Sequence, residues 1–330
     1  MKKINFILIT TFLVNIIFYN PLFSSEKKLS IAFVPKLVGI PYFSAMEKGG
    51  KEAAKNLGIK FIYDGPFTAD VSKQVEIIDN LITKGVDVIT VAPNDPAAIV
   101  PVLKKAKSRG ILVITSDTDG AENIREIFVN QALQEQIGYK TMDELAKAMN
   151  YEGEIAIVSC GATAWNLNTW ITAELARLTK YPKMKLVTIR YAEEDIQLAI
   201  NITLDLINAF PDLKGIIGQC TTSAPGVAEA VEQAGKKGKI VATGVSTPSM
   251  MKKYVKSGTV KSFVLWNTID LGYLTVWAGM YLKEGNKFED GKQYNVPGIS
   301  TKPKYIAKDK MLILGPPMVF DKENVDKYEF

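Results

Sequence analysis

Residues 34–58, "VPKLVGIPYFSAMEKGGKEAAKNLG", change their hydrophobic period within a few positions. The apolar run "IAFVP" at 31–35 is typical of a buried strand, and apolar residues then recur at helical spacing from Phe43 to Leu57. A buried strand that leads directly into an amphipathic helix is the repeating unit of parallel α/β sheets. The turn between them also carries Lys36 and Tyr42, which are unusual choices for a purely structural connection.

The same alternation continues along the chain and then begins again. Continuous apolar strands separated by amphipathic helices predict parallel sheets that are covered on both faces. We therefore predict an α/β fold with two doubly wound, Rossmann-like lobes, about five strands in each sheet and right-handed crossovers. The apolar stretch "MLILGPPMVF" at 311–320 is interpreted as one late strand or a covering segment. The expected strands lie at 31–35, 59–63, 86–93, 111–117 and 126–130, and again at 153–160, 185–191, 215–220, 239–245 and 260–266.

Composition excludes several classes of function. The chain has 330 residues, 47% hydrophobic and 23% charged, which is typical of a globular protein of about two domains. Its net charge is only +5 and no basic cluster is present, so no nucleic-acid partner is expected. The chain has no histidine, which removes the usual general base and the commonest metal ligand, and its two cysteines are too few for a metal site of thiolates alone. We expect no cofactor and no enzymatic activity.

The first 25 residues have the layout of a secretory signal peptide. A basic start, "MKK", precedes the uncharged apolar run "INFILITTFLVNIIF" and then a proline and small residues. We predict that residues 1–25 are removed after export, with cleavage near Ser24 or Ser25, and that the mature protein works in the periplasm. An uncleaved membrane anchor is the alternative, although the apolar run is shorter than the roughly 20 residues that a spanning helix needs.

Ligands of open parallel sheets bind beyond the carboxyl ends of the strands. The residues at those ends are mostly polar and uncharged, and aromatic residues lie close to them in the sequence. Such a set suits a small polyhydroxylated molecule, because hydroxyls need donors and acceptors while aromatic faces cover the C–H surface of a ring. The set comprises Lys36, Asp64, Pro93, Asn94, Asp117, Asn130, Cys160, Gln219 to Thr221, Ser246, Trp266 and Asn267, with Tyr42, Phe43, Trp165 and Trp170 as the aromatic residues.

Several of these residues also have an ordinary structural interpretation. Lys36 could be a solvated lysine, and Phe43 fits the apolar stripe of its helix, so core contact and cleft wall are both open for it. Tyr42 lies off that stripe and is the stronger candidate for stacking on a ligand. In "SDTD", Asp119 is available to cap the turn, which leaves Asp117 for the cleft.

Cys160 and Cys220 end the first and third strands of the second lobe. In a doubly wound sheet of order 2-1-3-4-5 these strands are neighbours, so the two α-carbons could lie within disulfide range. Two buried thiols that act as small apolar residues are the alternative. The sequence leaves both possibilities open.

Three longer stretches carry a family resemblance. "PKLVGIPYFSAMEKGGKEAAKNLG", "VAPNDPAAIVPVLKKAKSRGILVITSDTD" and "GVSTPSMMKKYVKSGTVKSFVLWN" resemble the periplasmic sugar-binding proteins that serve ABC importers, and among them the members that bind autoinducer-2. The resemblance implies two lobes that close over a ligand and are joined by three crossing strands, near 130–132, near 263–268 and after 296. It implies a first lobe of 26–130 plus 268–296, a second lobe of 131–267, and a tail of 297–330 that spans hinge and lobes.

The resemblance also suggests roles for individual residues. Lys36 matches a lysine that hydrogen-bonds the ligand, Asp117 matches a ligand-binding aspartate, and Tyr42 and Phe43 match an aromatic pair that stacks on the sugar. Other positions depart from the family pattern, so the identity of the sugar is open. Asn166 and Leu167 stand where the family has an Asp-Gln pair, Gln219 and Thr221 replace a proline and an alanine, and Asn267 replaces the aspartate that follows the tryptophan at 266.

These departures bear on ligand choice. Asparagine offers one acceptor and two donors where aspartate offers acceptors alone, and a ligand hydroxyl left without a partner beside Leu167 would cost roughly 1–3 kcal/mol. We expect a monomeric receptor that delivers autoinducer-2 or a related monosaccharide to the membrane permease of an ABC importer, and that could also dock to a chemoreceptor. A different pentose, hexose or deoxyhexose is the first alternative. A sugar-responsive regulator and an α/β enzyme are weaker ones.

Overall fold

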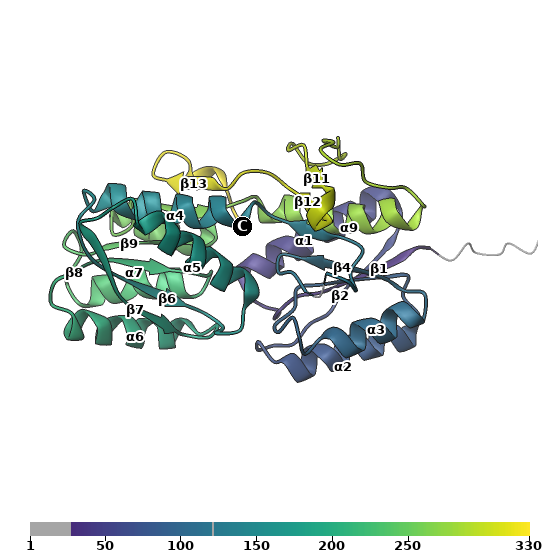
Figure 1. The fold of residues 1–330 in the computed structure, drawn as a ribbon, viewed down its shortest axis with the longest axis horizontal. Coiled ribbons are helices and arrows are strands. Elements are labelled where there is room, and N and C mark those ends of the chain that lie inside the picture. Colours follow the sequence, from purple (N-terminus) through teal and green to yellow (C-terminus); the bar gives the residue numbers. More distant parts are fainter. Residues whose placement is uncertain (1–27, 121) are drawn as a thin grey trace, which may run out of the picture.

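Two lobes, each built on a parallel β-sheet with helices on both faces, make up the computed structural model, which describes residues 28–120 and 122–330 (Figure 1). This confirms the predicted α/β fold. The predicted signal peptide at 1–25 lies outside the described residues. Within them, no helix has both the length and the apolar character needed to cross a bilayer.

The first lobe has the strand order β11-β12-β5-β4-β3-β1-β2, in which the five N-terminal strands are parallel. Every residue of β1 is buried, with Ile31 and Phe33 packed toward one face and Ala32 and Val34 toward the other. A strand covered on both sides needs apolar residues at every position, which explains the unbroken runs in the sequence. The elements are β1 (Ser30–Val34), α1 (Pro41–Leu57), β2 (Lys60–Tyr63), α2 (Val71–Lys84), β3 (Val88–Val91), α3 (Val100–Ser108), β4 (Leu112–Ser116) and β5 (Phe128–Asn130).

Helices α1 and α9 (Thr268–Lys283) cover one face of this sheet, and α2 and α3 cover the other (Figure 1). The crossing of α1 and α9 is made by two glycines. A β-carbon on Gly49 would overlap the backbone carbonyl of Ile269, and one on Gly272 would overlap that of Met46. The helices therefore pack backbone against backbone, and α1 is held at a fixed height above the sheet.

We expect Gly49→Ala to lower the free energy of unfolding by about 2–3 kcal/mol, because the added methyl group meets backbone that cannot rotate away. Gly161→Ala is the matched control, since its β-carbon would have the Ala164 methyl as its nearest neighbour, at 3.8 Å. Urea unfolding of both variants measures the difference. A Gly49→Ala loss no larger than that of Gly161→Ala would contradict backbone contact at this crossing.

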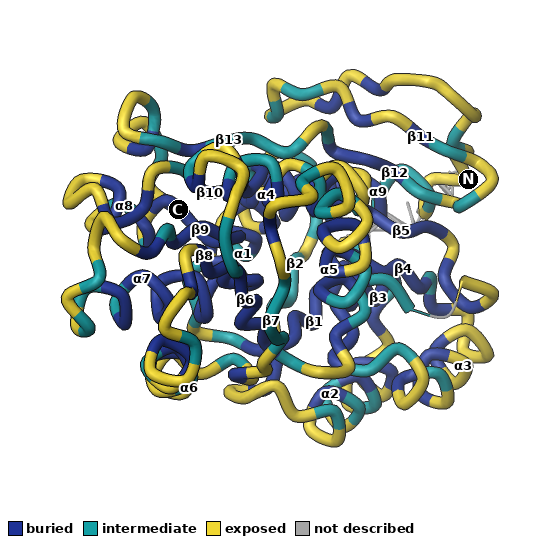
Figure 2. The backbone as a smooth tube through the Cα atoms, turned by 60° about the vertical axis from the view of Figure 1, so that its left-hand side comes forward, coloured by how far each residue is buried: buried dark blue, intermediate teal, exposed yellow. Residues whose placement is uncertain are grey.

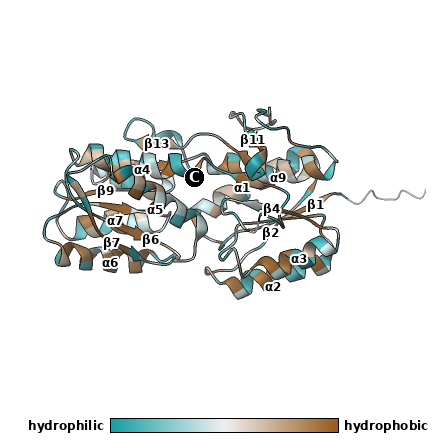
Figure 3. Cartoon of the chain, in the orientation of Figure 1, coloured by the Kyte–Doolittle hydropathy of each residue, from teal (hydrophilic) through white to brown (hydrophobic). Residues whose placement is uncertain are grey.

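The second lobe has the strand order β7-β6-β8-β9, which continues to β10 through isolated bridges at Ala242–Val260 and Val245–Val264. Helices α4 and α8 of this lobe were not among the predicted elements. Its strands are predominantly hydrophobic and, apart from the edge strand β7, buried, whereas the outer helices alternate in hydropathy (Figures 2 and 3). The elements are α4 (Gln134–Ala148), β6 (Gly153–Ser159), α5 (Trp165–Leu178), β7 (Met184–Tyr191), α6 (Ile196–Ala209), β8 (Leu213–Gly218), α7 (Ser223–Gln233), β9 (Val241–Gly244), α8 (Pro248–Ser257) and β10 (Ser262–Leu265).

Three segments cross between the lobes: 131–133 after β5, 266–267 before α9, and 314–317 in the C-terminal tail. The interpretation of "MLILGPPMVF" as one element was wrong. It forms β12 (Met311–Ile313), which pairs with β5 of the first lobe, and β13 (Met318–Asp321), which pairs with β10 of the second. Gly-Pro-Pro between them ends the first strand, because proline cannot donate to a strand ladder. The remaining tail elements are β11 (Lys304–Ile306) and two short 3₁₀ turns at Ala307–Asp309 and Val325–Lys327.

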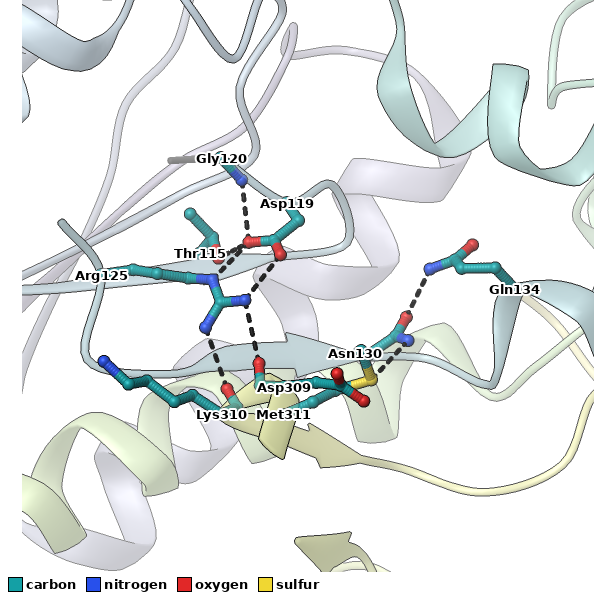
Figure 4. Close-up of polar contacts among 9 residues, drawn as sticks. All are labelled: Thr115, Asp119, Gly120, Arg125, Asn130, Gln134, Asp309, Lys310 and Met311. Carbon is teal, nitrogen blue, oxygen red and sulfur yellow. Dashed lines mark hydrogen bonds and ion pairs between the residues drawn. The ribbon is translucent and has the colours of Figure 1, made fainter. Parts of the chain in front are cut away.

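A buried arginine attaches the tail to the loop that follows β4 (Figure 4). Arg125 forms a bidentate ion pair with Asp119 and donates to the backbone carbonyls of Asp309 and Lys310, each at 3.0 Å. Asp119 also accepts from the Gly120 N–H at 2.8 Å, the turn-capping role expected for it. The loop that carries Asp117 is therefore held rigidly beside the hinge.

Candidate functional site

A small cavity lies between the lobes, at the carboxyl ends of both sheets. It is placed where doubly wound sheets bind ligands. Both lobes and one crossing segment contribute to its wall, so a bound molecule would contact all three. The lining residues are Lys36, Ile40, Tyr42, Phe43 and Asp117 from the first lobe, Asn166, Leu167, Trp170, Glu194, Cys220, Thr221 and Val245 from the second, and Trp266 from the crossing.

Lys36 reaches across the cavity from one lobe to the other. Its ammonium donates to the Asn166 Oδ1 of α5 at 2.8 Å, and the side chain is only 5% exposed. Burial lowers the pKa of Lys36, while the nearby carboxyls of Asp117 and Glu194 oppose that shift. This contact shows the two lobes closed on one another.

Asp117 is the centre of a hydrogen-bonded chain on the first-lobe side. The Tyr42 hydroxyl donates to Asp117 Oδ1 at 2.6 Å, Trp266 Nε1 donates to that hydroxyl at 3.1 Å, and the Thr118 hydroxyl donates to Asp117 Oδ2 at 3.0 Å. The backbone of Asp117 is left-handed, with φ of 66°. A non-glycine residue holds this conformation only when its surroundings fix it, and the Asp119–Arg125 pair two residues later provides that restraint. Burial raises the pKa of Asp117, while Lys36 and the hydrogen bonds from Tyr42 and Thr118 oppose the rise.

Aromatic rings form a continuous part of the wall. Tyr42 meets Phe43 and Trp266 edge to face, with ring centroids 5.1 and 5.9 Å apart, and Trp266 meets Trp170 at 5.7 Å. The indole N–H of Trp170 donates to Gln134 Oε1 of α4, so this ring has a fixed orientation. Rings of this kind can cover the C–H surface of a sugar. Trp165, predicted nearby, instead packs on Phe128 with centroids 5.9 Å apart.

Two of the residues that the family resemblance placed at the ligand do not line the cavity. The Gln219 side chain is fully buried beneath it and donates to the Glu174 Oε1 of α5 at 2.8 Å. The Asn267 Oδ1 caps α9 by accepting from the N–H groups of Ile269 and Asp270, at 3.1 and 3.2 Å. The other residues that the family resemblance placed at the ligand do line it: Lys36, Tyr42, Phe43, Asp117, Asn166, Leu167, Thr221 and Trp266. The remaining members of the wider strand-end set are not among the lining residues: Asp64, Pro93, Asn94, Asn130, Cys160 and Ser246.

Glu194 is the most important cavity residue that the sequence analysis missed. It lies in the turn between β7 and α6, and its side chain is partly buried at the cavity wall. Burial raises its pKa to about 7, while Lys36 and a hydrogen bond from Thr222 oppose the rise. The strand-end rule would have found it, because Glu194 follows the predicted strand at 185–191, but that strand's carboxyl end was not considered.

Cys160 and Cys220 form a disulfide at the same wall, with α-carbons 6.2 Å apart. The sulfurs lie just beyond β6 and β8, which are hydrogen-bonded neighbours as predicted. Of the two possibilities that the sequence left open, the structure has the disulfide. Cys220 also lines the cavity, in agreement with its place in the strand-end set.

Comparisons with known proteins agree with this architecture. Residues 31–287 match the family model described as a periplasmic binding protein domain. The D-ribose/D-allose-binding protein of Pseudomonas aeruginosa is 29% identical over 246 residues, which cover 72% of this chain and 76% of that protein. The D-allose-binding periplasmic protein of Escherichia coli is 27% identical over 250 residues, covering 73% of this chain and 80% of that protein.

Solved structures of ABC transporter binding proteins also match the fold of this chain. An ABC transporter solute binding protein from Clostridium phytofermentas with bound L-rhamnose is 30% identical, with a TM-score of 0.85 over 91% of this chain and 98% of that one. LsrB from Clostridium saccharobutylicum in complex with AI-2 has the same TM-score at 24% identity, over 92% and 100% of the two chains, and so supports the fold alone. With a family model matched over most of its length and a two-lobed fold that encloses a cavity at the hinge, this chain belongs to the periplasmic binding protein family.

Proposed function

We propose that the protein captures a small sugar or sugar-like polyol in the periplasm and delivers it to the membrane permease of an ABC importer. The observation that carries this proposal is the closed cavity, in which Lys36 and Asp117 of one lobe face Asn166 and Glu194 of the other. Charged and amide groups from both lobes supply donors and acceptors for hydroxyls, and the aromatic wall supplies stacking surface. A ligand that contacts both lobes favours the closed state over the open one.

We further propose that the ligand is a methyl-bearing sugar, either a deoxyhexose or autoinducer-2. Leu167, Val245 and the disulfide sulfur of Cys220 give the second-lobe wall an apolar part. A ligand hydroxyl directed there would lose its hydrogen bonds to water without a replacement, whereas a methyl group would not. The solved relative that is 30% identical carries L-rhamnose, which is a 6-deoxy sugar.

Calorimetry with L-rhamnose and L-mannose tests both parts of the proposal, because the two sugars differ only by a hydroxyl at C6. We expect L-rhamnose to bind more tightly by about tenfold or more, equivalent to roughly 1–3 kcal/mol for one unmatched hydroxyl. Leu167→Gln should narrow the difference by offering that hydroxyl a partner. Autoinducer-2, D-ribose, D-allose and D-arabinose complete the panel. Equal binding of the two L-sugars would contradict the methyl preference, and binding of no member of the panel would contradict the receptor function.

The chemical state of the released ligand distinguishes a receptor from an enzyme. We expect the protein to release its sugar chemically unchanged after incubation, as assayed by mass spectrometry. A docking role toward a chemoreceptor is compatible with the same closed state, and the monomeric state stays a prediction.

A further inference from the structure

A cluster of soft and hard metal-ligating groups lies at the second-lobe wall of the cavity. The sulfurs of Cys160 and Cys220 and a carboxylate oxygen of Glu194 all lie within 4.8 Å of one another. Glu194 Oε2 is 3.5 Å from Cys220 Sγ.

Two further groups point at the same cluster. The Thr222 hydroxyl lies 3.3 Å from Cys160 Sγ and 3.0 Å from Cys220 Sγ, and donates to Glu194 Oε2 at 3.4 Å. The backbone N–H of Ser223, the first residue of α7, donates to Cys220 Sγ at 3.5 Å. A helix N-terminus stabilises thiolate relative to thiol, and thiolate is the form that binds metal.

We propose that the protein, once its disulfide is reduced, binds a thiophilic divalent metal ion such as Zn²⁺ through Cys160, Cys220 and Glu194. A dithiol reductant supplies the two electrons: its two thiols become a disulfide, the Cys160–Cys220 bond breaks, and each cysteine sulfur takes a proton. The metal then displaces those two protons to solvent and bonds to two thiolates and one carboxylate. Water or the Thr222 hydroxyl completes four coordination. Two cysteines are too few for a site of thiolates alone, and the fold adds the carboxylate of Glu194.

The distances suit a tetrahedral site. With Zn–S near 2.3 Å and Zn–O near 2.0 Å, donor atoms around zinc lie roughly 3.5–4 Å apart. Starting from separations within 4.8 Å, the carboxylate has to approach by about 1 Å or less, while the sulfurs move apart. Rotation about the cysteine Cα–Cβ bonds separates the sulfurs while β6 and β8 keep the α-carbons 6.2 Å apart.

A route from solvent leads to the cluster. Glu194 and Thr222 also line a second, outer cavity at the mouth of the cleft, where Phe67 is 88% exposed. Because Glu194 and Cys220 line the inner cavity as well, bound metal should weaken binding of the cavity ligand; this consequence rests on the proposed function.

Cobalt binding tests the site without any sugar, so the result is independent of the proposed function. Anaerobic, reduced full-length protein is titrated with Co²⁺, whose thiolate charge-transfer and tetrahedral d–d absorptions report the ligands directly, and Zn²⁺ is then added in competition. We expect one Co²⁺ per chain in the reduced protein, displaced by Zn²⁺, and none in the oxidised protein. Cys160→Ser should lose the spectrum.

A second pair of variants keeps both cysteines and so preserves the fold-stabilising pair. Glu194→Gln should weaken Co²⁺ binding at least about tenfold, as loss of a charged ligand does, whereas Glu193→Gln, at the exposed neighbouring position, should bind as the unaltered protein does. Equal Co²⁺ binding by reduced and oxidised protein, or by Glu194→Gln and Glu193→Gln, would overturn the proposal.

Discussion

A Lys36→Met variant is expected to bind the cavity ligand about 100-fold more weakly than the unaltered protein, a loss of roughly 3 kcal/mol. Lys36 is the only cationic side chain among the residues that line the inner cavity in the described chain, and it faces the carboxyls of Asp117 and Glu194. Methionine keeps most of the aliphatic stem but leaves both carboxyls without a counter-charge. The bond to Asn166 that joins the two lobes is lost as well.

The matched control is Lys55→Met, which removes a lysine from the exposed surface of α1 in the same lobe. Calorimetry with the tightest ligand of the sugar panel measures both variants, and thermal unfolding verifies that each is folded. Lys55→Met should bind as the unaltered protein does. Binding by Lys36→Met within about threefold of the unaltered protein would show that the ammonium does not take part in recognition.

The sequence predicted the sheets well because their signal is local. A strand buried on both faces is apolar at nearly every position, as in β1 and β3, whose only polar residues are Ser30 and Thr90, and a glycine or proline commonly marks its end. Helix α8 was not predicted, although Pro248 begins it and the left-handed Gly258 ends it. The local sequence could not predict that β12 and β13 pair with different lobes, because their partner strands lie far away in the chain.

The positions of the strand ends predicted most of the candidate site. The residues that were predicted wrongly differ in the direction of their side chains. Gln219 and Cys220 are adjacent after β8, yet one side chain is directed into the lobe and the other lines the cavity. Successive side chains of extended backbone point to opposite sides, so an offset of one residue decides which of the two meets a ligand. Asn267 has two possible roles, because a residue at this position could face the cavity but is also the N-cap of α9. In the structure its side chain caps the helix.

The second large effect is expected for stability rather than binding, at a carboxyl beneath the cavity. Glu174 is fully buried in α5, and of its two oxygens only Oε1 has a hydrogen-bond partner within the described part of the chain, Gln219. Burial raises the pKa of Glu174 to about 8, against 4.5 for an ordinary glutamate, while the bond from Gln219 opposes the rise. Gln219 precedes Cys220 and Thr221 of the cavity wall, so this pair supports the loop that faces the ligand.

The sign of the pH effect follows from where the proton is held. Between pH 4.5 and 8 the folded protein keeps the Glu174 proton that the unfolded chain releases, so unfolding releases a proton and stability falls as the pH rises. The slope approaches 1.4 kcal/mol per pH unit, which amounts to about 3 kcal/mol by pH 7. Glu174→Gln resembles the protonated side chain and carries no such cost. It should therefore be more stable than the unaltered protein at pH 8 and nearly equal to it at pH 5.

Urea unfolding at pH 5, 6, 7 and 8 measures the free energy of unfolding of Glu174→Gln and of the unaltered protein. The difference between the two cancels the pH-dependent contributions of Asp117 and Glu194, which both proteins share. Glu135→Gln, an exposed change at the start of α4, is the control and should show a difference that is small at every pH. A stability difference for Glu174→Gln that does not grow between pH 5 and 8 would mean that Glu174 is charged in the folded protein. In that case the buried carboxylate would need a positive partner, and Lys36, the cation of the cavity above it, would be the first residue to test in a double variant. The growing difference is the result we expect, because a neutral Glu174 needs no counter-charge and still accepts the hydrogen bond by which Gln219 holds the cavity loop.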